Sequence, residues 1–266
     1  MTIGTTVLDF ARLARSKSDF LNENPFGFGL SAMMAGAYVG MGILLIFSVG
    51  QGVDPGIRPI VMGASFGLAL TLVVFAGSEL FTGHTMYMIH GRLAGSVTTS
   101  QVVKCWTMSW IGNLAGAVLL ATLFILGGSA LVLKGGGGDL IYIVAAKKIQ
   151  SSPVQLVALA MLCNWLVCLA IWASARTKND MAKCVIIFWC LYAFIAAGFE
   201  HSIANMTVFA VALLSDHPTS ISYAGALNNL FWVTLGNAIS GAGFMGVAYW
   251  HVAGRPRFSQ NESPKH

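Results

Sequence analysis

The sequence has few charged residues: Asp, Glu, Lys and Arg together make up 9% of its 266 residues. A soluble domain carries about a quarter charged residues, so this chain cannot cover itself with a water-soluble surface. Apolar residues make up 56% of the chain, and the mean hydropathy is +0.73. Lipid is therefore the expected solvent for most of the chain.

Several other features are missing, and each absence excludes a class of protein. No run of Lys and Arg is interleaved with aromatic residues, which argues against a nucleic-acid partner despite the net charge of +5. The five cysteines form no CxxC pair and lie in or beside apolar stretches, which argues against a disulfide framework. The chain has no GxSxG or HExxH motif and no paired catalytic carboxylates, so we expect no enzyme, no cofactor and no metal site. The first long apolar run begins near Phe26, too late for a signal peptide.

Long apolar segments dominate what remains. A helix needs about 20 residues to cross the hydrocarbon core. Six segments are long enough: 26–49, 59–91, 104–133, 153–175, 183–214 and 223–252. The second and fifth are too long for one span, and polar residues interrupt them near Glu79 and Glu200. The sequence predicts an all-α polytopic membrane protein with six transmembrane helices, of which the second and fifth are broken.

The basic residues predict an orientation. With both termini in the cytoplasm, eleven of the 15 Lys and Arg residues lie inside and four lie outside. The four outside are Arg58, Lys134, Lys147 and Lys148. This bias agrees with the positive-inside rule and places the loops 134–152 and 215–222 outside. We expect residues 1–24 to form an amphipathic segment on the inner leaflet, 25–252 the channel domain, and 253–266 a polar cytoplasmic tail.

The chain contains an internal repeat. Gly112-Asn113 in the third segment matches Gly236-Asn237 in the sixth, 124 residues later. Gly77-Ser78-Glu79 in the first break matches Gly198-Phe199-Glu200 in the second, 121 residues later. Each repeat holds three spans, and two tandem copies of an odd-span unit enter the membrane in opposite directions. This is an inverted repeat, in which a solute path is expected where the broken helices meet.

The breaks hold the titratable residues of greatest interest. Glu79 and Glu200 are costly in a membrane and must be paired. One interpretation is structural, with each carboxylate accepting hydrogen bonds from backbone N–H groups that the break leaves free; the other is contact with the solute. His201 has no histidine counterpart in the first repeat, which favours a specialised role over a structural one. His84 is interpreted equally well as a helix cap or as a functional residue.

Several features of the breaks favour an anion. Thr82 and Asn205 offer neutral hydrogen-bonding groups there. Half-helices that start after the breaks would turn their positive N-terminal ends toward the centre. Lys147 and Lys148 lie on the outer side against the orientation rule, and attraction of an anion accounts for them better than snorkelling does.

Three motifs resemble the formate/nitrite transporter family. They are Gly77-Ser78-Glu79-Leu80-Phe81-Thr82-Gly83-His84-Thr85-Met86, Cys163-Asn164-Trp165-Leu166-Val167-Cys168-Leu169-Ala170 and Gly198-Phe199-Glu200-His201-Ser202-Ile203-Ala204-Asn205-Met206. The likeness extends from about Pro25 to Trp250 and is strongest to the bacterial nitrite channels of the family. It implies an aquaporin-like protomer, a homopentamer, and one pore in each protomer.

The resemblance also assigns residues. It implies that His201 is the central pore histidine, that Thr82 faces it, and that Lys148 is the vestibule lysine, 16 residues before Asn164. The expected pore residues are His201, Thr82, Lys148, Asn164, Glu200 and Asn205. The expected hydrophobic constrictions are Phe66, Leu70, Leu80, Phe81 and Phe194. Glu79, Asn113 and Asn237 are expected to support the breaks.

The resulting hypothesis is a nitrite channel of the bacterial inner membrane. The anion is attracted by Lys148 and the helix dipoles, and it is protonated near His201, where the histidine either gives the proton itself or only orients a protonated species. The expected partners are nitrite, other small monovalent anions such as formate, protons and lipid. Alternatives are a formate channel and an aquaporin-like channel for neutral solutes. A haem-binding electron-transfer subunit, with ligands among His84, His90, His201 and His251, is a further alternative.

Overall fold

The computed structural model describes residues 2–129, 132–134 and 138–258, and in these ranges the chain is helical without strands. Five helices are long and apolar enough to cross a membrane. They are α2 (Pro25–Gly50), α3 (Arg58–Ala76), α5 (Thr99–Leu126), α7 (Pro153–Ala175) and the continuous run Tyr223–Val252, which comprises α10 (Tyr223–Ser240), the π-helical η1 (Gly241–Val247) and α11 (Ala248–Val252).

Two of the apolar segments are divided where the sequence predicted breaks. The second consists of α3 and α4 (Phe81–Ala94), and the fifth consists of α8 (Asp180–Ala196) and α9 (Ser202–Leu213). Gly77 and Gly198 lie in these breaks with φ of 69° and 73°. Glycine adopts this left-handed conformation without the Cβ clash that other residues meet, so each glycine ends the helix before it.

Local sequence signals fix the other helix ends. Asn24 caps α2 by accepting the backbone N–H of Gly27 at 2.8 Å, with Pro25 in the first turn. Capping boxes start α5 and α7, through Thr98 with Gln101 and through Ser152 with Gln155. Because of the first box, α5 begins five residues before the expected start at residue 104. It ends at Leu126, and residues 130–131 of the expected segment lie outside the described residues.

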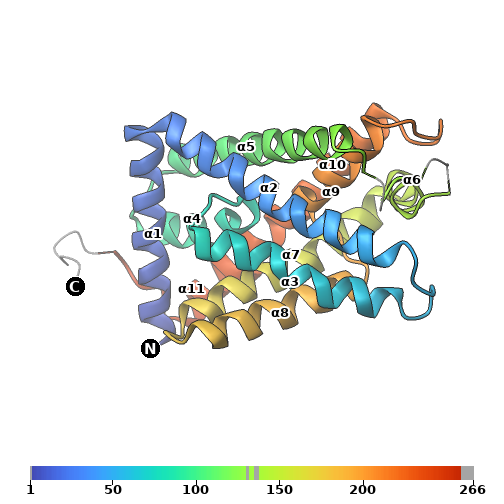
Figure 1. Cartoon of the computed structure of the whole chain (residues 1–266). Helices are drawn as coiled ribbons and strands as arrows, with labels where there is room; N and C mark the ends of the chain where they lie inside the picture. The colour runs from blue at the N-terminus through green and yellow to red at the C-terminus, as the bar shows by residue number, and fades with distance from the viewer. Residues whose placement is uncertain (1, 130–131, 135–137, 259–266) are drawn as a thin grey trace.

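The long apolar helices run side by side, with one further helix at each end of the bundle (Figure 1). At one end, α1 (Ile3–Glu23) lies across the ends of the long helices, on the side where the chain begins. At the other end lies α6 (Leu140–Gln150). We call these ends the α1 face and the α6 face. The backbone N–H of Phe258 bonds Ala94 O beside α1, so both ends of the described chain lie at the α1 face.

The helices α1 and α6 change two expectations. The segment 134–152, expected as a loop, contains α6; its residues 135–137 are not described. The expected amphipathic helix is α1, but its apolar residues Val7, Phe10 and Ala14 are buried against protein rather than left for lipid. Phe10 stacks on Tyr87 and His90 of α4. The tail 253–266 is described only to Phe258, and residues 259–266 lie outside the described part.

The packing has the same plan in both halves. In the first half α2 packs against α5 and α3, and in the second half α7 packs against α10 and α8. At the α2–α5 crossing, a Cβ atom on Gly116 would overlap the backbone of Met33, so only glycine permits this approach. Such close crossings bring Asn113 and Asn237, each on the inner side of its helix, within reach of the two breaks.

Candidate functional site: a vestibule, a central histidine and two carboxylate clusters

Asn113 of α5 holds the first break together. Its Oδ1 accepts the backbone N–H of Phe81 at 3.0 Å, and its Nδ2 donates to the carbonyls of Glu79 at 3.0 Å and Ala32 at 2.7 Å. The side chain is completely buried. One amide therefore satisfies three backbone groups from α2, the break and α4, groups that could not find water in a membrane.

Asn237 of α10 does the same for the second break. Its Oδ1 accepts the backbone N–H of Ser202 at 2.9 Å, and its Nδ2 donates to the carbonyls of Glu200 at 3.1 Å and Ala160 at 2.8 Å. One freed backbone N–H group at each break, that of Phe81 or that of Ser202, thus bonds an asparagine. The interpretation in which Glu79 and Glu200 accept these groups is wrong, because both carboxylates are engaged by side chains.

Glu200 is the centre of the cluster toward the α6 face. Its Oε1 accepts a hydrogen bond from Lys148 Nζ at 2.8 Å and its Oε2 accepts one from Asn205 Nδ2 at 2.6 Å. Asn229 supports both partners, since it bonds Asn205 through Oδ1 and the Lys148 carbonyl through Nδ2. Lys148 is thus half of an ion pair, and its charge is largely neutralised by Glu200.

A vestibule of about 260 Å³ leads inward from this cluster. Its lining combines polar groups with apolar residues, most of them from α2, α8 and α9. The polar lining residues are Lys147, Lys148, Ser151, Glu200, His201 and Asn205. Lys147 is exposed, and among the described residues it has no ion pair. The vestibule therefore carries a net charge of about +1 from two lysines and one carboxylate.

Glu79 forms a matching cluster toward the α1 face. Its Oε1 accepts a hydrogen bond from Lys17 Nζ at 2.5 Å, and its Oε2 lies 2.8 Å from His84 Nε2. Lys17 of α1 was not among the expected site residues. One signal was present in the sequence: the residue five positions after each glutamate is polar, His84 in one repeat and Asn205 in the other. His84 lies inside α4, whose N-cap is Leu80, so it is not the helix cap considered above.

His201 ends the vestibule at the middle of the bundle. It is the N-cap of α9, where its Nδ1 accepts the backbone N–H of Ala204 at 3.2 Å. An accepting Nδ1 carries no proton, so in the neutral ring the proton is on Nε2. Nε2 lies 3.4 Å from Thr82 Oγ1, across the gap between the two broken segments. The sequence-predicted pair of His201 and Thr82 is therefore brought together.

Beyond His201 the path is closed by apolar side chains. A cavity of only about 10 Å³ lies there, lined by residues of α2, α3, α7 and α8 together with Leu80 and His201. Phe66 packs edge-on against Phe194 with ring centroids 5.6 Å apart. Four of the expected constriction residues meet at this point: Phe66, Leu70, Leu80 and Phe194. This cavity holds at most about one water molecule.

Two expected site residues lie behind the path. Asn164 is buried, and its Nδ2 donates to Thr85 Oγ1 at 2.9 Å and to the Asn237 carbonyl at 2.7 Å. It lines neither the vestibule nor the small cavity. Phe81 points away from the small cavity and packs against Trp106, with ring centroids 6.2 Å apart.

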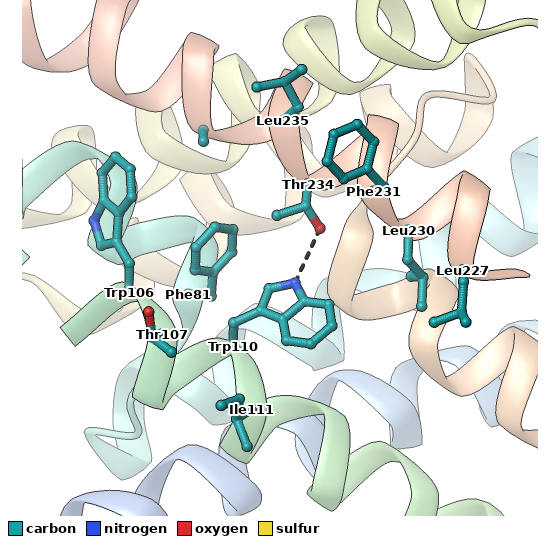
Figure 2. Close-up of a pocket in the computed structure, with 11 residues that line it drawn as sticks. Phe81, Trp106, Thr107, Trp110, Ile111, Leu227, Leu230, Phe231, Thr234 and Leu235 are labelled. Atoms are coloured by element: carbon teal, nitrogen blue, oxygen red, sulfur yellow. Dashed lines mark hydrogen bonds between the residues drawn. The ribbon is translucent and has the colours of Figure 1, made fainter. Parts of the chain in front are cut away.

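Phe81 instead lines a larger groove of about 540 Å³ between α5 and α10, which Figure 2 shows. Its lining is apolar apart from two threonines. The Trp110 indole N–H donates to Thr234 Oγ1 at 3.0 Å, and no charged side chain lines the groove. An anion in this groove would lose its hydration without meeting a positive charge. The smaller, charged vestibule is therefore the better candidate for a solute site. Among the described residues, no group of three or more His, Cys, Asp or Glu side chains is placed to hold a metal ion.

Comparison with known proteins agrees with this geometry. The family described as "Formate/nitrite transporter" matches residues 7–251. The chain belongs to the formate/nitrite transporter family. It is 48% identical to the nitrite transporter NirC of Escherichia coli (strain K12), over 98% of this chain and 97% of the relative. Members of the family are named as transporters and channels, not as enzymes.

Two solved structures share the fold. An FNT family ion channel superposes with a TM-score of 0.91 at 47% identity, over 93% of this chain and 98% of that chain. A pentameric formate channel with formate bound superposes with a TM-score of 0.72 at 27% identity, over 85% and 96% of the two chains. The formate/nitrite transporter fold therefore accounts for nearly the whole chain.

Proposed function

We propose that the chain conducts nitrite across the bacterial inner membrane, with both termini in the cytoplasm and five copies in the channel. The observation that carries this proposal is the position of His201 Nε2, at the inner end of a charged vestibule and directly before the closed apolar cavity. The nitrite transporter at 48% identity supports the choice of substrate, and the pentameric formate channel supports the assembly.

The proposed architecture counts α3 with α4, and α8 with α9, as one broken transmembrane segment each. This gives six segments in two inverted halves. The support is the point-by-point match of the breaks: Asn113 with Asn237, and the Glu79 cluster with the Glu200 cluster. Both ends of the described chain lie at the α1 face, which requires an even number of crossings between them. By the distribution of basic residues, the α1 face is cytoplasmic.

His201 holds the anion rather than supplying the proton. A second proton on the ring would have to displace the Ala204 N–H from Nδ1, and loss of the Nε2 proton would leave an imidazolate. In the proposed path, nitrite accepts a hydrogen bond from Nε2–H, and one of its oxygens takes a proton from a hydronium ion in the vestibule. The O–H bond of nitrous acid forms and water is left behind. The neutral acid then crosses the apolar constriction without the cost of moving a bare charge there.

Flux into liposomes tests this function. We expect the purified protein to pass nitrite fastest, formate more slowly, and chloride hardly at all, because chloride is the anion of an acid too strong to form in neutral water. Nitrite influx no faster than in protein-free liposomes would overturn the proposal. Formate influx faster than nitrite influx would favour the formate channel, and glycerol-driven swelling would favour a channel for neutral solutes.

The vestibule lysines give a graded prediction. We expect Lys148→Ala to lower nitrite flux more than Lys147→Ala, because it leaves the Glu200 carboxylate without its cation beside His201. The Lys147→Ala effect should fade in high salt, since an exposed charge is screened. The double variant Lys148→Ala/Glu200→Gln should recover part of the lost flux. Equal losses from the two single lysine variants, without recovery in the double variant, would contradict this account.

A further inference from the structure

The two carboxylate clusters differ in one member. Each has a glutamate paired with a lysine, Glu79 with Lys17 and Glu200 with Lys148. Each also has a third residue five positions after the glutamate, which contacts the other carboxylate oxygen. That residue is His84 toward the α1 face and Asn205 toward the α6 face. A histidine gains and loses a proton near neutral pH, whereas an amide does not.

His84 can take a second proton without losing a bond. Its Nε2 lies 2.8 Å from Glu79 Oε2, which makes Nε2 the protonated nitrogen of the neutral ring. Its Nδ1 is buried and has no hydrogen-bond partner in the described part of the chain. This is the reverse of His201, whose Nδ1 is occupied by the Ala204 N–H. Burial and the Lys17 ammonium oppose a charge on this ring, and the carboxylate of Glu79 offsets them through its hydrogen bond and its negative charge.

Among the described residues, Glu79 and Tyr87 contact His84, and Lys17 acts on it as the partner of Glu79. Cys105 of α5 and Cys168 of α7 lie near Tyr87, and His90 lies further along α4 against Phe10 and Trp172. The η1 segment has no titratable side chain, and α10 has only Tyr223, at its far end. Tyrosine and cysteine are neutral at neutral pH, so Lys17 and Glu79 provide the fixed charges.

The charge of the two clusters therefore responds differently to acid. With neutral His84, the Lys17–Glu79–His84 cluster has a net charge of zero, and one proton on Nδ1 raises it to +1. The Lys148–Glu200–Asn205 cluster stays at zero. The Lys17 side chain is 18% exposed, so the first cluster meets water at the α1 face. A proton that arrives from that face leaves a positive charge beside Leu80 and the central constriction, where it attracts anions.

We propose that His84 makes nitrite flux respond to the pH on the α1 face, through a charge on the Glu79 cluster that the Glu200 cluster does not acquire. The inference rests on the proposed function. His84 is thereby assigned as a positioning residue that acts on the anion through the charge of the Glu79 cluster. As a consequence, acid changes nitrite flux from one face of a nearly symmetric channel more than from the other.

The test measures nitrite flux in vesicles of known orientation, established by protease removal of an N-terminal tag. Nitrite is added on one face, and the pH of that same face is lowered from 7.5 to 5.5 while the other face is held at 7.5, so that the proton gradient always favours nitrite entry; the experiment is then repeated from the other face. In the wild type, we expect acid on the α1 face to raise flux roughly tenfold more than acid on the α6 face, as a full charge near the path would do. The same pH gradient drives flux through every variant. The ratio of a variant's flux to the wild-type flux therefore reports the effect of the substitution and not the effect of the gradient.

Three variants make the result specific. His84→Asn copies the other cluster and should respond equally to acid from either face. Asn205→His places a titrating group in the second cluster and should add a response from the α6 face. His90→Asn is the matched control, because His90 is a buried histidine of the same helix that stacks on Phe10, packs against Trp172 and pairs with no carboxylate among the described residues. It should keep the wild-type difference between faces.

The outcomes separate this inference from the proposed function. If wild-type vesicles pass no nitrite beyond protein-free vesicles, both fall. If nitrite flows and His84→Asn keeps the wild-type difference between faces, the inference is wrong and the proposed function stands. If His84→Asn does not fold, Asn205→His provides the test. If nitrite flux through Asn205→His responds to acid on the α6 face no more than wild-type flux does, the inference is wrong.

Discussion

Replacing Asn237 with leucine is expected to remove the folded channel from the membrane. The leucine has nearly the same size, but it leaves three buried backbone groups without partners: the N–H of Ser202 and the carbonyls of Glu200 and Ala160. Each unsatisfied group costs about 1–3 kcal/mol, so the total is about 3–9 kcal/mol. That is comparable to the whole stability of a typical domain, which is about 5–15 kcal/mol.

The measurement is the yield and thermal stability of the oligomer in mild detergent. Asn113→Leu should fail in the same way, because Asn113 satisfies three equivalent groups at the first break. Asn228→Leu is the matched control on the same helix: Asn228 is exposed, and its side chain accepts a hydrogen bond from the indole N–H of the partly buried Trp232. If Asn237→Leu gives the same yield and thermal stability as Asn228→Leu, the breaks are stabilised by something other than these amides.

His201→Phe is expected to lower nitrite flux about 10- to 150-fold. The phenyl ring fills the same space but has no Nε2–H to donate to the anion. A hydrogen bond to a charged group contributes about 1.5–3 kcal/mol, and about 1.4 kcal/mol corresponds to a factor of ten. The loss should appear in nitrite flux into liposomes at a fixed pH gradient, with the oligomer still assembled.

His201→Asn separates the two roles of the histidine. Asparagine is a favoured N-cap residue, so its Oδ1 can accept the Ala204 N–H while its Nδ2 still offers a donor to the anion. If the proton comes from water, this variant keeps a flux that rises as the pH falls. If His201 itself supplies the proton, His201→Asn will be as inactive as His201→Phe, and the mechanism proposed above is wrong.

The breaks were predictable from sequence because their signals are local, whereas the pairing of His201 with Thr82 came from the family resemblance. A glycine followed by a glutamate inside a long apolar run has few interpretations, and its repetition at Gly77 and Gly198 makes the prediction stronger. The four constriction residues and Lys148 came from the family resemblance, and the structure places them at the cavity and the vestibule. Their roles in transport remain predictions.

The missed features depend on contacts between distant segments. Lys17 and Glu79 are 62 residues apart, and nothing in the pattern of either segment indicates that α1 folds across the end of the bundle to join them. The helix α6 has only 11 residues, too few for the apolar length test, so it was interpreted as loop. Phe81 was assigned to the constriction by its neighbours in sequence, but the start of α4 turns its ring toward Trp106.

The small cavity beside His201 also has a bioenergetic consequence. Protons hop along files of water, and a space of about 10 Å³ holds no file. The described conformation therefore does not let protons leak down their gradient along a file of water. If each anion crosses only together with one proton, transport is electroneutral, and at equilibrium the anion gradient mirrors the pH difference. Each pH unit then corresponds to about tenfold accumulation. A cell could thus set its internal nitrite level through its pH gradient while leaving its membrane voltage untouched.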